Sequence, residues 1–270
     1  MTKDEWTAQS YYERIDEGEY KPTAHASGAW STDEQHFSPL GGLIVHAVER
    51  HLASAATRPD MLFSRFSFDI LGRIALDKTR ISVETIRPGR TIELVEAVVT
   101  IAGRAVVRAR AWLLAPQDTS EVEGGAPAAL PSPERLDRWA MSERWPGGYI
   151  ESIDVRPVGE PRPGRATAWV STPLTLVHGE RSSALANYMA LVDTANGIAV
   201  RQPPMRWMYP NIDMSVHLYR QPEGRWTGLD TTVVFGAAGL GVTSTVLHDV
   251  HGPVGYAQQA LTVRSQPAAE

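Results

Sequence analysis

The chain contains two blocks of the same kind, each with helical apolar spacing followed by stretches in which apolar and polar residues alternate. The first block predicts a helix over residues 38–55 and strands over 63–71, 79–87, 90–102 and 104–115. The second predicts a helix over 182–199 and strands over 211–220, 225–236, 241–249 and 255–264. Segments 18–23 and 164–172 predict one further strand before each helix. This shared order of elements indicates a divergent internal duplication.

A stretch rich in Pro, Gly, Ala and acidic residues, 115–134, separates the blocks and is typical of a linker. A helix that lies across an antiparallel sheet buries one face of each element. We therefore predict an α+β fold with two helix-on-sheet halves that pack sheet beside sheet. The expected division is 1–115 for the first half, 116–148 for the linker and 149–270 for the second half.

The second helix raises a chemical question, because its last turns contain an acid. Leu185, Met189, Val192 and Asn196 recur at helical spacing, and Asp193 borders the same face. Gly197 is the expected C-cap of this helix, since Pro203 and Pro204 follow. A carboxylate that faces a sheet would lose its hydration, which raises its pKa. The alternative is a surface acid at the edge of the apolar stripe.

Two amides offer partners for that acid. Alternation in the last strand places Gln259 on a face that is otherwise apolar, and a buried amide needs hydrogen-bond partners. We expect Gln259 to meet Asp193 and hold a water molecule; a structural hydrogen bond to a loop is the alternative, and Gln258 replaces Gln259 if the register shifts by one. Strict alternation turns Asn211 away from the helix, but it opens its strand, where such departures occur.

The start of the first helix is the second candidate site. Ser38 is the expected N-cap and Pro39 the first helical residue. A helix N-terminus offers free N–H groups and a partial positive charge, and Gly41 and Gly42 would admit a ligand carbonyl close to the backbone. Such a terminus can stabilise an oxyanion. The alternative is tight helix packing at the glycines. His36, just before the helix, is a candidate ligand contact, base or exposed loop residue.

Composition narrows the classes of function. The 270 residues include no cysteine, which excludes disulfides, thiolate metal sites and a cysteine nucleophile. The net charge of −5 lacks the basic excess of a nucleic-acid binder. No apolar run is long enough to span a membrane, and the charged N-terminus contains no signal-peptide core. The segment 236–244 resembles a phosphate-binding loop but lacks its lysine, so it is expected to be a turn. His248 and His251 have no matching third ligand, which disfavours a metal site. The absence of a G-x-S-x-G elbow disfavours a serine hydrolase.

The segments "LVDTANG", "NIDMSVHLYRQPEGRWTGLD" and "HGPVGYAQQALTVR" resemble the type II acyl-CoA thioesterases, which have a double hotdog fold. "HASGAW" and "QH" before the first helix resemble the related thioesterase-like proteins of actinobacteria. The resemblance covers residues from about 11 to 264. In that family, an aspartate, a threonine or similar residue, and a glutamine position the nucleophilic water. These roles fall on Asp193, Asn211 and Gln259, with Asn211 departing from threonine.

The resemblance implies hydrolysis of acyl-CoA thioesters in fatty acid metabolism, without a cofactor or metal and without a covalent intermediate. The expected acyl tunnel is lined by Met189, Met205, Trp207 and Met208. A non-catalytic acyl-CoA or lipid-binding protein on the same scaffold is one alternative. A hotdog hydratase or dehydratase is another; it needs a His–Asp pair, for which His36 is the only candidate. The expected partners are the acyl-CoA substrate and further copies of the chain as a homo-oligomer, in the cytoplasm.

Overall fold

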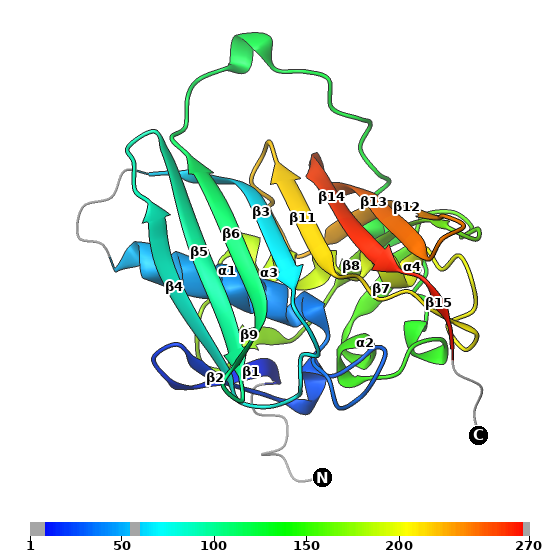
Figure 1. Ribbon diagram of the computed structural model, residues 1–270. Coiled ribbons are helices and arrows are strands. Elements are labelled where there is room, and N and C mark those ends of the chain that lie inside the picture. The colour runs from blue at the N-terminus through cyan, green and yellow to red at the C-terminus, as the bar shows by residue number, and fades with distance from the viewer. Residues whose placement is uncertain (1–8, 55–59, 267–270) are drawn as a thin grey trace, which may run out of the picture.

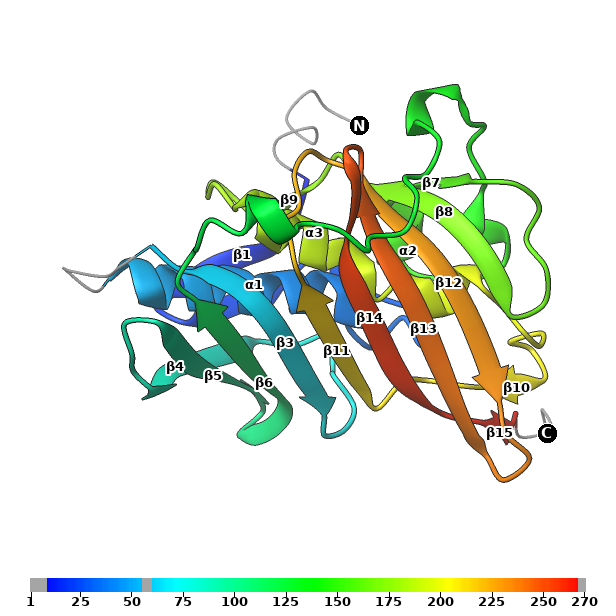
Figure 2. The ribbon, with the colours of Figure 1, turned by 90° about the horizontal axis from the view of Figure 1, so that it is seen from above.

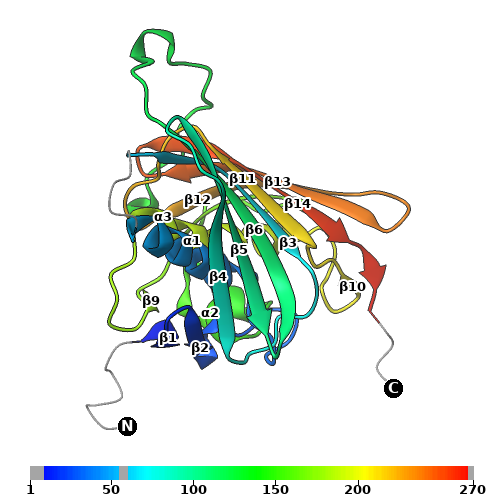
Figure 3. The same cartoon turned by 60° about the vertical axis from the view of Figure 1, so that its left-hand side comes forward.

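One sheet of 13 strands runs through the computed structural model, which describes residues 9–54 and 60–266. The sheet curves around helices on its concave side (Figures 1 and 3). The strands of the first half are β1 (Ser10–Asp16), β2 (Glu19–Pro22), β3 (Leu62–Ile70), β4 (Thr79–Arg87), β5 (Ile92–Ile101) and β6 (Arg104–Leu114). The strands of the second half are β7 (Asp154–Pro157), β8 (Arg165–Ser171), β9 (Thr175–Val177), β11 (Asp213–Leu218), β12 (Thr227–Phe235), β13 (Leu240–Asp249) and β14 (Gly252–Thr262).

The remaining elements are the helices and a second, smaller sheet. Four α-helices are described: α1 (Phe37–Ala53), α2 (Gly148–Ser152), α3 (Ala184–Val192) and α4 (Ala195–Ile198). A separate two-stranded sheet pairs β10 (Trp207–Met208) with β15 (Arg264–Ser265). Within the described residues, no helix is long and apolar enough to cross a membrane. The predicted end of the first helix at residue 55, and the predictions for residues 1–8, lie outside the described residues.

The strand order confirms the α+β prediction and the duplicated arrangement. The first half contributes β3-β6-β5-β4 followed by β2, and the second contributes β11-β14-β13-β12 followed by β8. Beyond these strands lie β1 and β9 on one side of the sheet and β7 on the other. The halves join where β3 and β11 pair antiparallel, with Phe66 opposite Val216 (Figure 2). Segments 18–23 and 164–172 therefore form strands at matching positions in the two halves, and the sequence predicts a strand in each segment. The sheet is continuous because each half contributes its first meander strand to the junction.

Helices α1 and α3 pack against each other on the concave side of the sheet (Figure 1). Gly42 makes their close approach possible, because a Cβ atom on Gly42 would lie 2.6 Å from both Ala186 O and Ala190 Cβ. Side chains of both helices enter one apolar core with the inward residues of the strands. The close contact of the two helices fixes the start of α1 relative to the end of α3.

Both predicted helix ends differ from the structure. His36, not Ser38, is the N-cap of α1, and Pro39 is its third residue. Helix α3 ends at Val192 with Asp193 as its C-cap, and Gly197 lies inside the short helix α4. The acid that the sequence places within a helix therefore stands where that helix ends. A carboxylate at a C-cap lies near the negative end of the helix dipole, so it depends on other groups for stabilisation.

Candidate active site

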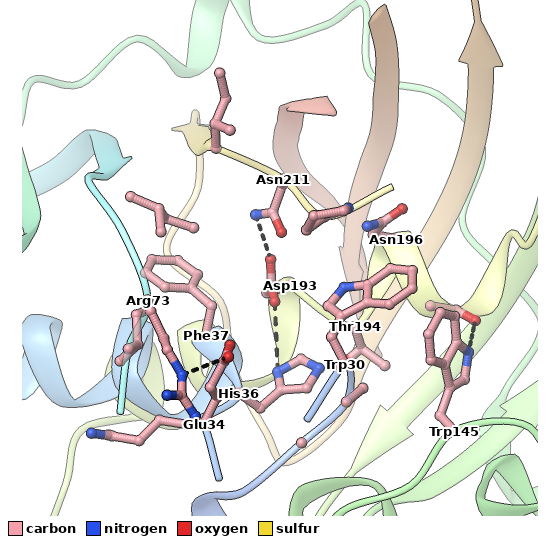
Figure 4. Close-up of a pocket in the computed structure, with 18 of the residues that line it drawn as sticks. Trp30, Glu34, His36, Phe37, Arg73, Trp145, Asp193, Thr194, Asn196 and Asn211 are labelled. Carbon is pink, nitrogen blue, oxygen red and sulfur yellow. Dashed lines mark hydrogen bonds and ion pairs between the residues drawn. The ribbon is translucent and has the colours of Figure 1, made fainter. Parts of the chain in front are cut away.

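Asp193 is 7% exposed, and its carboxylate is held by two amide side chains. Asn211 Nδ2 donates to Asp193 Oδ1 over 2.9 Å, and Gln259 Nε2 donates to the same oxygen over 2.6 Å. The other oxygen, Oδ2, lies 3.6 Å from His36 Nδ1. Figure 4 shows Asp193 between Asn211 and His36. The structure thus brings the three residues that the resemblance marks, and His36, into one cluster.

Asn211 reaches Asp193 because it does not belong to a regular strand. Strand β11 begins at Asp213, and Asn211 forms only an isolated bridge with Leu261. Its Nδ2 also donates to Asp213 O over 3.1 Å, which fixes the amide beside the carboxylate. Asn211 therefore departs from strand alternation, because the chain that leads into β11 is irregular.

Gln259 lies on the inner face of β14, as alternation predicts. Gln259 is 2% exposed and its neighbours Ala257 and Leu261 are buried with it, whereas Gln258 points outward and is exposed. The register of β14 against β13, with Gln259 opposite Thr243, fixes this orientation. Gln258 is therefore excluded as the partner of Asp193.

His36 comes from the first half and completes the cluster across the two halves. As the N-cap of α1, its Nδ1 accepts the Ser38 N–H over 3.1 Å. An accepting Nδ1 carries no proton, so the 3.6 Å approach to Asp193 Oδ2 is neither a hydrogen bond nor an ion pair. Burial lowers the pKa of His36 to about 3, in agreement with a neutral ring.

The neighbours of His36 explain the "QH" and "HASGAW" segments. Gln35 is buried and fully bonded: Tyr12 Oη donates to its Oε1, and its Nε2 donates to Ala75 O and Thr79 Oγ1. Ser27 accepts the Gly148 N–H on its Oγ, which ties the first segment to α2. These bonds fix the backbone on both sides of the loop that carries His36.

Tyr149 on α2 is a site residue that the sequence reasoning missed. Its ring stacks on the His36 imidazole at 4.2 Å between centroids, and its hydroxyl bonds Thr194 Oγ1 at 2.6 Å. Burial raises the pKa of Tyr149, so its hydroxyl stays protonated. The only sequence signal was an apolar segment after the linker, which does not distinguish a site tyrosine from a core tyrosine.

A cavity of about 390 Å³ opens beside the cluster. On one side lie the ion-paired Arg73 and Glu34, whose Nε and Oε1 atoms are 2.9 Å apart (Figure 4). On the other side, the wall is apolar and aromatic, and consists of Trp30, Met141, Trp145 and Ile150. The indole rings of Trp30 and Trp145 pack edge to face at 4.9 Å, and Trp145 Nε1 donates to Gly197 O over 3.0 Å. This wall is therefore rigidly held.

The predicted acyl-tunnel residues lie outside this cavity lining. Met189 is fully buried in the core, because it faces inward from α3. Met205 is 87% exposed, and Trp207 and Met208 belong to the peripheral strand β10. The tunnel expected from the resemblance is corrected because the segment between α4 and Asn211 passes through the separate two-stranded sheet before it returns to the cavity. Trp30 and Trp145 take their place in the lining.

Gly41 and Gly42 do not line the cavity either. Their N–H groups are the fifth and sixth of α1, where they bond to carbonyls of the preceding turn. Gly42 instead admits α3, which is the packing alternative considered for the sequence. Among the first-turn N–H groups, Ser38 donates to His36 and Pro39 has none, which leaves the Phe37 N–H without a hydrogen-bond partner among the described residues. Phe37 itself belongs to the cavity lining.

The Asp193 carboxyl has an unusual electrostatic environment. Burial raises its pKa from 3.8 to about 7, and the hydrogen bonds from Asn211 and Gln259 oppose that rise. The group therefore changes its ionisation near neutral pH. A buried carboxyl with this property beside a cavity has the character of a general base.

Comparison with known proteins gives the family. Residues 26–114 match the acyl-CoA thioesterase N-terminal domain, and residues 127–263 match the acyl-CoA thioesterase C-terminal domain. The chain therefore belongs to the acyl-CoA thioesterase family. The family match confirms the resemblance predicted from the sequence motifs.

Solved structures show the same fold at low sequence identity. A conserved protein of unknown function with a hot dog fold from Alicyclobacillus acidocaldarius aligns with a TM-score of 0.71 and 12% identity, over 94% of this chain and 96% of its own. The acyl-CoA thioesterase II TesB2 from Mycobacterium marinum aligns with a TM-score of 0.65 and 15% identity, over 96% of each chain. None of the curated proteins matches this sequence. The fold is thus the predicted double hotdog.

Proposed function

We propose that this protein hydrolyses acyl-CoA thioesters to a free carboxylic acid and CoA, with Asp193 as the general base. The observation that carries the proposal is the asymmetry of the Asp193 carboxylate. Its Oδ1 accepts two amide N–H groups, while Oδ2 has no hydrogen-bond partner among the described residues and belongs to a side chain that lines the cavity. A carboxylate oriented in this way offers one oxygen to a water molecule.

The reaction is balanced with one water and one base. Water donates a hydrogen bond to Asp193 Oδ2, and its oxygen attacks the carbonyl carbon of the thioester while the proton passes to Asp193. The tetrahedral intermediate then breaks its C–S bond, and CoA leaves as a thiolate that takes up the proton. The products are the carboxylic acid and CoA thiol, and Asp193 returns to the carboxylate.

The two amides act on the Asp193 carboxylate directly, and they act on the nucleophilic water only through that carboxylate. Both donate to Oδ1, which stabilises the ionised form and fixes the plane of the carboxyl group. Asn211 therefore supplies an N–H where the family pattern has a hydroxyl, and either group is a donor. The substitution keeps the interaction that orients Asp193.

The developing negative charge on the carbonyl oxygen needs a donor. The N–H of Phe37, at the first position of α1, is the backbone donor that we assign, in place of Gly41 and Gly42. The positive end of the α1 dipole acts in the same direction. Because Phe37 belongs to the first half and Asp193 to the second, the reaction requires both halves of the chain.

The test is release of CoA thiol from acyl-CoA substrates of increasing chain length. We expect turnover by the wild type and a loss of at least about 100-fold in kcat for Asp193→Asn, since general base catalysis contributes roughly 10²–10⁴-fold. Asp69→Asn makes the same chemical change on the exposed outer face of β3 and should leave the rate unchanged. Acyl-CoA binding without hydrolysis by the wild type would instead identify a non-catalytic binding protein.

A hydratase or dehydratase is the second candidate, because the structure places His36 within 3.6 Å of Asp193. This chemistry needs a histidine that exchanges a proton. The Nδ1 of His36 already accepts the Ser38 N–H, and burial lowers the pKa of the ring to about 3, so the geometry favours thioester hydrolysis. Loss of the enoyl absorbance of a 2-enoyl-CoA without release of thiol would favour the hydratase.

A further inference from the structure

We propose that His36 is a neutral electrophile in this reaction: its Nε2–H donates a hydrogen bond to the carbonyl oxygen of the thioester. The proposal rests on the proposed hydrolysis and assigns a second donor beside the Phe37 N–H. In this role the imidazole polarises the carbonyl and stabilises the oxyanion, and no proton leaves the ring.

The hydrogen bond to the first turn of α1 determines the tautomer. A backbone N–H can only donate, so Nδ1 is the acceptor in the 3.1 Å contact with Ser38. The proton of a neutral imidazole must then lie on Nε2. Among the described residues, Nε2 has no hydrogen-bond partner, although His36 lines the cavity. A polar N–H of a cavity-lining side chain that has no protein partner is available for a ligand oxygen.

The ring is held rigidly in this orientation. Tyr149 covers one face of the imidazole at 4.2 Å, with an interplanar angle of 32°. The Tyr149 hydroxyl is in turn held by Thr194, the residue after Asp193. In Figure 4 the dashed line from Asp193 reaches one ring nitrogen, and the other nitrogen lies on the far side of the ring. Preorganised donors of this kind are effective because they need no reorganisation when charge develops.

Burial keeps the ring neutral, and it does so against the neighbouring Asp193, whose ionised form would favour an imidazolium. Asp193 lies 3.6 Å from Nδ1, Tyr149 stacks on the ring, and Arg73 and Glu34 form an ion pair at the cavity wall. No cation of the described residues contacts the ring, and burial holds the pKa of His36 far below neutrality. A neutral imidazole that polarises a carbonyl after a helix N-terminus has lowered its pKa is an established catalytic device.

The position of the proposed base places the substrate beside this donor. A water molecule on Asp193 Oδ2 lies next to His36, since Oδ2 and Nδ1 are 3.6 Å apart. The carbonyl carbon must approach that water closely for attack. The thioester carbonyl therefore lies alongside the imidazole, where Nε2–H is the ring donor that no protein group uses.

Two substitutions at position 36 separate this role from the structural role of the N-cap. His36→Asn keeps an oxygen that can cap α1 but removes the Nε2–H. His36→Gln loses the favoured cap geometry but carries an amide N–H on a longer side chain that extends toward the position of Nε2. We expect kcat to fall by about 10²–10³-fold in the Asn variant, the loss typical of one oxyanion donor. The Gln variant should regain at least about tenfold of this loss, although its thermal stability is lower.

Nitrogen chemical shifts of the ring give a readout independent of turnover. We expect a protonated Nε2 and a bare Nδ1 that do not change between pH 5 and pH 8. A protonated Nδ1, an imidazolium in this range, or an Asn variant as active as the Gln variant would overturn the proposal. A wild type without any acyl-CoA hydrolysis would instead remove the proposed function, and the assignment of His36 with it.

Discussion

Gln259 donates from Nε2 to Asp193 Oδ1 over 2.6 Å, between the inner face of β14 and the end of α3. The two residues are 66 positions apart, and the contact is buried. Because the hydrogen bond favours the carboxylate while burial favours the carboxylic acid, the pKa of Asp193 settles near 7, between the two effects. The group is therefore sensitive to pH in the range in which an enzyme works.

The first prediction concerns the pH dependence of hydrolysis. The folded-state pKa of Asp193 is raised to about 7, so below that pH the base is increasingly protonated and cannot accept a proton from water. We expect kcat/KM to fall about tenfold for each pH unit below 7 and to reach a plateau above pH 8, since kcat/KM reports the free enzyme. Initial rates from pH 5 to pH 9 measure it. A flat profile would contradict Asp193 as the base.

The second prediction concerns stability. A carboxyl whose pKa is raised on folding binds more protons in the folded than in the unfolded chain between about pH 4 and pH 7, so its penalty grows as pH rises through this window. Asp193→Asn removes the penalty and keeps an oxygen that can accept both amide donors. We expect the variant to be more stable than wild type by up to about 4 kcal/mol at pH 8, at about 1.36 kcal/mol per pKa unit, and nearly equal at pH 4.

Guanidinium unfolding at both pH values measures this difference, with Asp69→Asn as the control for lost charge at the surface. Equal stability of Asp193→Asn and wild type at pH 8 would show that the carboxylate is better solvated than its 7% exposure indicates. A gain in stability together with a loss of turnover is the behaviour expected of a group kept for function rather than for folding.

The third prediction tests the departure at Asn211. Asn211→Val removes the N–H donor to Asp193 Oδ1, while Asn211→Thr has nearly the same shape as Val and restores a donor. Because the lost bond favours the ionised carboxylate, the Val variant should shift the midpoint of the pH profile upward and lower kcat/KM at pH 7 by about tenfold. The Thr variant should retain most of the activity. Equal losses in both variants would assign Asn211 to packing.

Periodicity predicted the parts of this molecule that depend on local sequence. The strand alternation around Gln259 and the order of elements in both halves follow from side-chain hydrophobicity, and both are confirmed. The pairing of Asp193 with Gln259 was expected from the faces on which the two residues lie, and the family resemblance added Asn211. No periodicity brings together residues on a helix end, an irregular segment and a strand.

The rest of the site depends on tertiary contacts that the sequence does not display. Trp30 and Trp145 meet at the cavity from two loops more than 100 positions apart, in segments without regular spacing. His36 became the N-cap because its ring nitrogen accepts the Ser38 N–H, although serine is the residue more often found at that position. Gly41 and Gly42 are adjacent in sequence, but only the packing of α3 shows that a side chain would clash at Gly42 and not at Gly41.

The fourth prediction uses these glycines as a matched pair. A Cβ at Gly41 makes only ordinary contacts of 3.6 Å or more, whereas a Cβ at Gly42 would meet Ala186 O and Ala190 Cβ at 2.6 Å. Gly41→Ala should be neutral or stabilising by about 0.5–1 kcal/mol, because alanine favours the helix. Gly42→Ala should destabilise by about 1–3 kcal/mol through overpacking. Thermal unfolding distinguishes them, and a Gly41→Ala variant that is stable but inactive would restore the predicted oxyanion role.

The fifth prediction concerns the acyl group. The apolar side of the cavity is bounded by Trp30 and Trp145, whose rings fix each other at 4.9 Å, so the wall cannot retreat to admit a longer or bulkier acyl chain. Trp30→Leu removes the half-buried ring of the pair and should raise kcat/KM for longer acyl-CoA substrates relative to shorter ones by about tenfold, the effect of one or two methylenes in an apolar pocket.

Trp207→Leu is the matched control, because Trp207 lies on β10 outside the cavity and is 38% exposed. It should leave the ratio of kcat/KM values across the acyl-CoA series unchanged. A changed ratio in the Trp207 variant with none in the Trp30 variant would return the acyl chain to the tunnel predicted along Met205, Trp207 and Met208. The comparison works because both variants lose the same indole, so only the location of the ring relative to Asp193 differs between them.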